Sequence, residues 1–253
     1  MDLWQSLFLL VAGVVAGALN AMVGSGSLVT FPTLLALGYP PVAANVTNKI
    51  GIVPGAISGA LAYRRELRAH TGLLVKLMPA SLVGGFLGAL ILFALPASTF
   101  EAVVPGLILF ACALVLVQPA VRRLTGWSSS ALDRGRSRLA ALIALAFVAG
   151  IYGGYFGAAQ GVVLIAVLTL LFDGSMQTSN AVKNALAATA NTAAAVVFIV
   201  AGGISWLPVV ILAVGSSVGG QIGGRLGKRL PPLVYRIVIV CVGLAAVAKL
   251  LAD

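Results

Sequence analysis

Runs of apolar residues, separated by short polar stretches, recur along almost the whole chain. Several runs come near or exceed the roughly 18–20 residues that a helix needs to cross a bilayer. The clearest predict membrane-spanning helices at 43–63, 77–95, 101–121, 180–201, 206–224 and 233–251. The chain is 60% hydrophobic and 9% charged, whereas about a quarter of the residues in a soluble domain are charged. We therefore predict an all-α polytopic membrane protein, whose short N-terminus begins its first span rather than a cleaved signal peptide.

Two further apolar stretches, 4–38 and 139–172, are too long for one straight membrane helix. As a single helix each would be about 51 Å long, against a hydrocarbon core of about 30 Å. Small or flexible residues interrupt both near the middle, with GSGS at 24–27 and GAAQG at 157–161. Each stretch is therefore predicted to form a hairpin of two arms, and the pattern leaves open whether the arms cross half or all of the bilayer.

The positive charges gather in three groups, whose positions predict the topology. Thirteen of the 16 Lys and Arg residues are in Arg64, Arg65, Arg68 and Lys76, then Arg122, Arg123, Arg134, Arg136 and Arg138, then Arg225, Lys228, Arg229 and Arg236. Short basic loops between spans are typical of the cytoplasmic side, so the net charge of +10 does not indicate nucleic-acid binding. An even number of crossings must separate the groups, so the hairpins return to the side they enter. Both termini are then expected on the non-cytoplasmic side of a bacterial-type inner membrane.

The two halves of the chain resemble each other. GVVAGALNAMVGSG at 13–26 resembles FVAGIYGGYFGAAQ at 147–160, and NVTNKIG at 45–51 resembles NAVKNAL at 180–186. Since the charge pattern starts the first half outside and the second half inside, we predict two inverted repeats, each a broken hairpin plus three transmembrane helices. The boundaries are 1–121 for the first repeat, 122–138 for a basic cytoplasmic loop and 139–253 for the second repeat. Inverted repeats are a common plan of secondary transporters.

The two breaks predict one central binding site. Non-helical backbone at membrane depth is tolerated only where protein or a water-filled cavity surrounds it. The second arms are expected to begin at about Ser27 and Gln160, where the free N–H groups and partial positive charge of a helix N-terminus favour an anion. The structural alternative is that the glycines of the breaks only allow tight helix packing.

Polar residues inside the spans indicate the same site. Lys49 and Lys183 lie in predicted helices away from an obvious interface, at nearly equivalent places in the two halves. A charge there usually faces a cavity or a partner, and because no Asp or Glu lies deep in a span, a transported anion could be that partner. Snorkelling to the interface is the alternative. The predicted substrate-binding residues are Asn20, Ser25, Gly26, Ser27, Asn48, Lys49, Gln160, Gly161, Lys183, Asn184 and Asn191.

Other kinds of site find little support in the sequence. Cys112 and Cys241 lie singly in apolar spans, and the only histidine, His70, lies beside a basic loop. The sequence therefore predicts no metal site, no cofactor and no catalytic residue. A serine hydrolase built on Ser25 or Ser27 would lack a histidine base, so we expect no enzymatic activity. An anion channel is an alternative, because it would use the same basic residues and broken helices.

Residues 20–51, NAMVGSGSLVTFPTLLALGYPPVAANVTNKIG, resemble the N-terminal signature of the TauE/SafE sulfite exporters, also called toluene-sulfonate uptake permeases. The glycine-rich break, Pro32 and the TNK triplet at 47–49 carry the resemblance, which extends over the whole chain. The chain departs from the family pattern at Ser27 and in the second break.

The resemblance implies a secondary transporter for sulfite, a sulfonate or another organosulfur oxyanion, often coupled to protons. Small carboxylates are alternative substrates. The expected partners are a small anion and membrane lipid, with protons as the candidate coupling ion and no nucleic acid. The direction of transport and the oligomeric state are left open.

Overall fold

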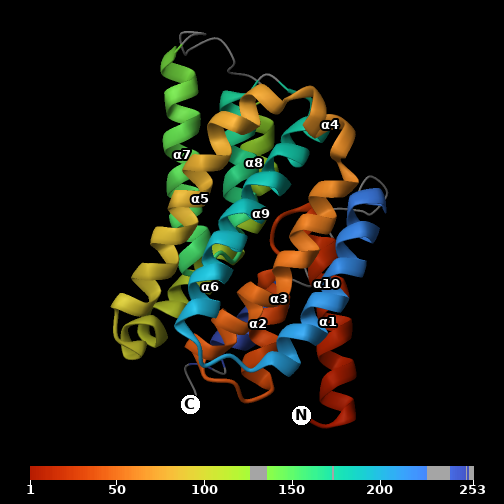
Figure 1. Cartoon of the computed structure of the whole chain (residues 1–253), viewed down its shortest axis with the longest axis vertical. Coiled ribbons are helices and arrows are strands. Elements are labelled where there is room, and N and C mark those ends of the chain that lie inside the picture. Colours follow the sequence, from red (N-terminus) through yellow and green to blue (C-terminus); the bar gives the residue numbers. More distant parts are fainter. Residues whose placement is uncertain (126–135, 173, 227–239, 249, 251–253) are drawn as a thin grey trace.

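Long helices that run between the two ends of the molecule dominate the fold (Figure 1). The structure is a computed structural model and describes residues 1–125, 136–172, 174–226, 240–248 and 250. Its helices are α1 (Leu3–Met22), α2 (Ser27–Ala36), α3 (Pro41–Ala62), α4 (Arg64–Ala69), α5 (Thr71–Ala94), α6 (Ala97–Thr125), α7 (Arg136–Tyr155), α8 (Gln160–Leu171), α9 (Met176–Ala201) and α10 (Trp206–Leu226). Residues 240–248 are also helical, and none of the described residues forms a strand.

Six of these helices are long and apolar enough to cross a membrane, which confirms the prediction of an all-α polytopic membrane protein. They are α1, α5, residues 97–117 of α6, α7, α9 and α10. Helix α3 has 22 residues and is long enough to cross, at about 33 Å. It is less apolar because Asn45, Asn48 and Lys49 lie in its first half. The last predicted span, 233–251, lies partly outside the described residues.

Both predicted hairpins are present, and their second arms are short. The second arms begin at Ser27 and Gln160, as the sequence predicts, and have 10 and 12 residues. They are therefore about 15 and 18 Å long, roughly half of a 30 Å hydrocarbon core. Figure 1 shows α1 rising from the lower end of the molecule and α7 descending from the upper end. The two breaks consequently lie near the middle of the molecule.

Helices of one half pack closely on helices of the other half. Helix α10 lies along α1 and α3, and α5 lies along α7 and α9. A Cβ added to Gly219 of α10 would overlap the carbonyl oxygen of Val14, and one added to Gly88 of α5 would overlap that of Ile151. Small residues let membrane helices approach closely, because helix association in lipid depends on packing. The helices around the breaks are thus held by backbone-to-backbone contacts.

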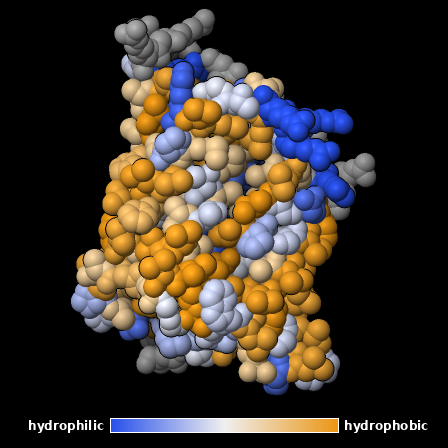
Figure 2. Space-filling model, viewed as in Figure 1, coloured by the Kyte–Doolittle hydropathy of each residue, from blue (hydrophilic) through white to orange (hydrophobic). Residues whose placement is uncertain are grey.

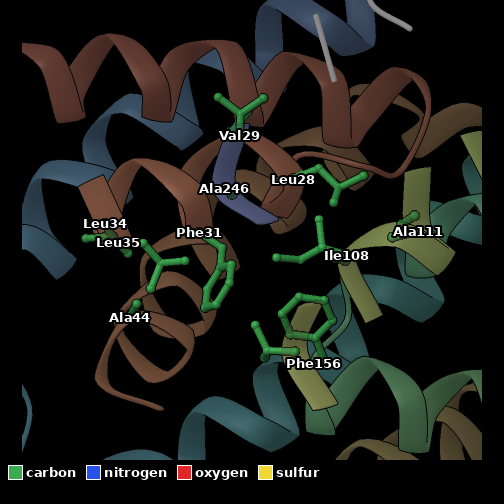
Figure 3. Packing of buried hydrophobic residues seen from close by; sticks show 14 of the residues in the cluster. Leu28, Val29, Phe31, Leu34, Leu35, Ala44, Ile108, Ala111, Phe156 and Ala246 are labelled. Atoms are coloured by element: carbon green, nitrogen blue, oxygen red, sulfur yellow. The ribbon is translucent and has the colours of Figure 1, made fainter. Parts of the chain in front are cut away.

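Protein rather than lipid surrounds the short arm α2. All of its residues from Ser27 to Leu35 are buried. The ring of Phe31 packs edge-to-face on Phe156 of the second break, with 5.2 Å between the ring centroids. Figure 3 shows this pair together with Leu28 of α2 and Ile108 of α6. The shielding satisfies the condition under which a membrane protein tolerates interrupted helices.

The arginines of α4 lie toward one end of the molecule. The helix α4, which carries Arg64, Arg65 and Arg68, lies at the upper end with the start of α7, whereas the N-terminus lies at the lower end (Figure 1). The parity of crossings, the side of the termini, the inverted repeat and its boundaries stay predictions. Helix α6 continues to Thr125 and α7 begins at Arg136, so both extend into the predicted loop 122–138. Four residues of the predicted basic groups lie outside the described residues: Arg134, Lys228, Arg229 and Arg236.

Candidate functional site

The two breaks meet backbone to backbone. The N–H of Gly161, at the start of α8, donates to the carbonyl oxygen of Gly24 with an N···O distance of 3.0 Å. A Cβ on either glycine would overlap the Cα of the other. Gly24 also has a φ of +85°, a left-handed conformation that glycine adopts without a steric penalty. Only glycine at both positions allows this contact.

The first arms of the two hairpins end in the same kind of turn. The N–H of Gly24 donates to the carbonyl of Leu19 at 3.1 Å, and the N–H of Gly157 donates to the carbonyl of Tyr152 at 2.9 Å. Gly157 has a φ of +73°, close to that of Gly24. Such bonds over a residue of positive φ are typical of helix C-termini. The two donors, Gly24 and Gly157, are 133 positions apart, and so are the two acceptors, Leu19 and Tyr152. This is the offset at which the two halves of the sequence resemble each other.

Lys49 of α3 lies at the end of α7. Its side chain is fully buried, and Nζ donates to the carbonyl of Gly153, in the last turn of α7, and to Oδ1 of Asn191 at 3.1 Å. The last four carbonyl groups of a helix have no partner within the helix, and that end carries partial negative charge. The ammonium group therefore caps a helix of the opposite half.

Lys183 of α9 makes the corresponding contact at the end of α1. It is also fully buried, and Nζ donates to the carbonyls of Asn20 at 3.1 Å and Ala21 at 3.2 Å. The side chain of Asn184 adds a hydrogen bond of 3.1 Å to the same carbonyl of Ala21. Neither lysine reaches an interface, so snorkelling does not describe this structure.

The region around the breaks is positive. One lysine outweighs the roughly half negative charge at each C-terminal helix end, and the N-terminal ends of α2 and α8 add about half a positive charge each. None of the described carboxylates offsets this charge, because Asp2 and Glu101 are exposed and Glu66 is half-buried on α4. A buried positive region with no carboxylate favours an anionic ligand.

Several hydrogen-bond donors at the first break have no partner. Ser25 Oγ and Asn48 Nδ2 are buried and find no hydrogen-bond partner among the described residues. The backbone N–H groups of Ser25, Gly26 and Ser27 likewise donate to none of these residues. Thr30 links Asn48 to the backbone of the first break, since its hydroxyl donates to Asn48 Oδ1 at 2.5 Å and to the carbonyl of Gly26 at 3.4 Å. These donors form what we call the first-break cradle: Ser25, Gly26, Ser27 and Asn48.

The predicted donors of the second break are already bonded within the protein. Gln160 Nε2 donates to the carbonyl of Ala149 at 3.1 Å, and the N–H of Gly161 is taken by Gly24. The hydroxyl of Tyr152 holds the carbonyl of Ala158 at 2.5 Å. The structure therefore brings the eleven predicted residues to the two breaks. Backbone N–H groups without a partner among the described residues occur at both, in residues 25–27 and 158–159, whereas the unpartnered side-chain donors Ser25 and Asn48 lie at the first.

Further polar residues of this region are missing from the predicted set, Tyr152 among them. They also include Thr30, Asn45, whose Nδ2 donates to the carbonyl of Tyr155 at 2.8 Å, and Asn180, whose Nδ2 donates to that of Ala21 at 3.2 Å. Asn45 and Asn180 are the first residues of the two related motifs NVTNKIG and NAVKNAL. Their equivalent positions were the signal that could have added them to the site.

A family model described as sulfite exporter TauE/SafE matches residues 9–250. The chain belongs to the TauE/SafE family. Three relatives match this TauE/SafE chain over most of their length. A "probable membrane transporter protein" of Haemophilus influenzae is 27% identical over 216 residues, or 85% of this chain and 82% of the relative. The "probable membrane transporter protein ORF9" of a Sinorhizobium species is 28% identical over 251 residues, or 97% of this chain and 92% of the relative.

The third relative, the "probable membrane transporter protein YfcA" of Escherichia coli K12, is 27% identical over 266 residues, or 100% of this chain and 95% of the relative. None of the three names states a substrate. The comparisons and the six apolar helices establish a multi-pass member of a membrane transporter family.

Replacing Gly24 by Ala should destabilise the TauE/SafE chain, because the new Cβ would push the two breaks apart. Gly38→Ala is the matched control, since Gly38 has a φ of +88° but no atom within 4 Å of an added Cβ. Both variants lose about 1–2 kcal/mol to the left-handed conformation, and Gly24→Ala should lose about 1–3 kcal/mol more through overpacking. Thermal unfolding in detergent measures the difference. Equal losses would show that the breaks do not need to touch.

Proposed function

We propose that the protein is a secondary transporter for a small anion, most simply sulfite, a sulfonate or another organosulfur oxyanion. The observation that carries the proposal is the first-break cradle, whose donors have no partner among the described residues. Two buried lysines lie beside it, and none of the described carboxylates is buried. An oxyanion offers only hydrogen-bond acceptors, so it suits the unpartnered N–H and O–H donors of the cradle. Hydrogen bonds to a charged group are roughly twice as strong as neutral ones.

The cradle also has the backbone geometry of an anion site. Ser27 is the first residue of α2, so the unpaired N–H groups at 25–27 are those of a helix N-terminus. A helix N-terminus attracts anions through these groups and through its dipole. The first break thus offers backbone donors and the Ser25 hydroxyl, and Thr30 links the Asn48 amide to it.

The closed breaks favour a carrier over an anion channel. The backbone contact between Gly24 and Gly161 and the burial of α2 separate the two ends of the molecule. The packing of α10 on α1 and α3, and of α5 on α7 and α9, suggests two groups of helices that can move relative to each other. Rocking of two such groups around a fixed site is the alternating-access mechanism of inverted-repeat transporters.

A ligand panel tests the proposal. The purified protein is heated in detergent with sulfite, thiosulfate, short sulfonates or small carboxylates, since a ligand that binds only the folded state raises its stability by RT ln(1 + [L]/Kd). We expect stabilisation by the sulfur oxyanions; stabilisation by carboxylates alone would favour the alternative substrate class. Counterflow in proteoliposomes then separates a carrier, whose flux saturates, from a channel. A pH gradient across the same vesicles tests protons as the coupling ion.

Ser25→Ala should weaken anion binding without destabilising the protein. The hydroxyl has no partner within the described structure, so its removal breaks no internal hydrogen bond. A lost hydrogen bond to a charged ligand is worth about 1.5–3 kcal/mol, or roughly a ten- to hundredfold rise in Kd. Ser179→Ala is the matched control, because Ser179 is also buried with an unpartnered Oγ but lies outside the predicted site. An unchanged Kd for Ser25→Ala would remove this serine from the site.

Lys183→Met should raise the Kd for the anion by roughly ten- to hundredfold. Methionine keeps an apolar side chain but removes the positive charge beside the first break. It also leaves the carbonyls of Asn20 and Ala21 with one donor fewer, so stability should fall by about 1–3 kcal/mol. Lys49→Met should act similarly, and Lys76→Met, at an exposed lysine of α5, should change neither quantity. Lower stability with an unchanged Kd would mean that the lysines only cap the helices.

A further inference from the structure

A groove of about 950 Å³ lies on the outer surface of the helix bundle, apart from the two breaks. Helices α3 and α5 form its walls, α9 forms its floor and α4 closes one end. Figure 2 shows this face, with hydrophilic residues over α4 at the upper right and a mostly hydrophobic surface below them. None of the eleven predicted site residues lines the groove.

Small residues of α9 create the groove. Its floor includes Ala185, Thr189 and Ala193, while larger apolar side chains such as Leu61 and Leu82 stand on the walls. Successive helix residues are about 100° apart, so these floor residues lie on the side of α9 opposite to Asn180, Asn184 and Asn191. The groove is therefore a second site, separated from the breaks by the width of one helix.

The dimensions of the groove match one leaflet of a bilayer. Along α5 its lining runs from Leu74 to Phe86, which corresponds to about 18 Å of helix. Half of the hydrocarbon core is about 15 Å thick. Leu61, Leu82 and Phe86 are more than a third exposed, so the groove opens sideways toward lipid. A lipid acyl chain could therefore lie along it.

Two arginines with no partner mark the end of the groove. Arg64 and Arg68 line it and make no ion pair or hydrogen bond within the part of the chain that the structure describes. The one carboxylate of α4, Glu66, accepts a hydrogen bond from Gln177 of α9 instead. Positive charge thus lies where the headgroup of a lipid in the groove would be.

We propose that this groove binds one anionic phospholipid, with its phosphate between Arg64 and Arg68 and an acyl chain along α5 and α9. Basic pockets between transmembrane helices on the cytoplasmic side are typical sites for anionic headgroups. Guanidinium groups suit a phosphate because they offer paired donors in a fixed plane. The assignment does not depend on the identity of the transported anion.

Phosphatidylglycerol is the probe, and phosphatidylcholine with the same acyl chains is the lipid control. The protein is purified in a nonionic detergent, and native mass spectrometry measures lipid retention while thermal unfolding measures stabilisation. We expect phosphatidylglycerol to bind at least about tenfold more tightly than phosphatidylcholine. The double variant Arg64→Gln with Arg68→Gln should remove this preference, since each basic residue near an anionic headgroup raises the affinity for it several-fold.

Arg65→Gln is the matched control, because Arg65 belongs to the same helix but does not line the groove. Ala193→Leu fills the floor and should weaken both lipids, whereas Ala102→Leu, at an exposed position of α6, should weaken neither. Equal binding of the two lipids, or equal effects of the Arg65 and the paired arginine variants, would overturn the proposal. It would also fail if the paired variant weakened binding of sulfite or a short sulfonate and left lipid retention unchanged.

Discussion

A helix that ends inside a membrane must have its last carbonyl groups satisfied by protein, and this requirement shapes the centre of the molecule. Lys49 of the first half donates to a carbonyl group at the end of α7, and Lys183 of the second half donates to one at the end of α1. An ammonium group suits the task because it offers three donors and a positive charge to the negative end of a helix. Because each lysine binds a helix end of the opposite half, these contacts hold the two halves together at the two breaks.

The sequence predicted the position of the breaks well because its signals there are local. Small and flexible residues inside apolar stretches marked both interruptions, and the second arms begin at the predicted Ser27 and Gln160. The partners of the lysines could not be predicted in this way. Backbone carbonyls occur at every residue, so a lysine that binds them leaves no signature in residue type. The short length of the second arms could not be predicted either, because a hairpin that crosses half of the bilayer and one that crosses all of it give the same charge pattern.

The two breaks have diverged in their chemistry although their turns are alike. Ser25 of the first break corresponds to Ala158 of the second at the offset of 133. Ser25 has a hydroxyl with no partner among the described residues, whereas Ala158 has no polar side chain and its carbonyl accepts from Tyr152. Gln160 points its amide back to α7. The departures of the second break from the glycine-rich family pattern thus remove side-chain donors from it, and in the proposed site the side-chain contacts to an anion come from the first half of the chain.

Helix α9 connects the centre of the molecule to its lipid-facing surface. One side carries Lys183, which holds the end of α1, and the opposite side forms the floor of the groove beside α5. A helix of 26 residues moves largely as a rigid body, and close-packed neighbours transmit its displacement. If the rocking motion proposed above moves α9 when α1 leaves Lys183, the groove floor moves with it. A lipid in the groove and an anion at the breaks would then each change the affinity for the other by the same factor.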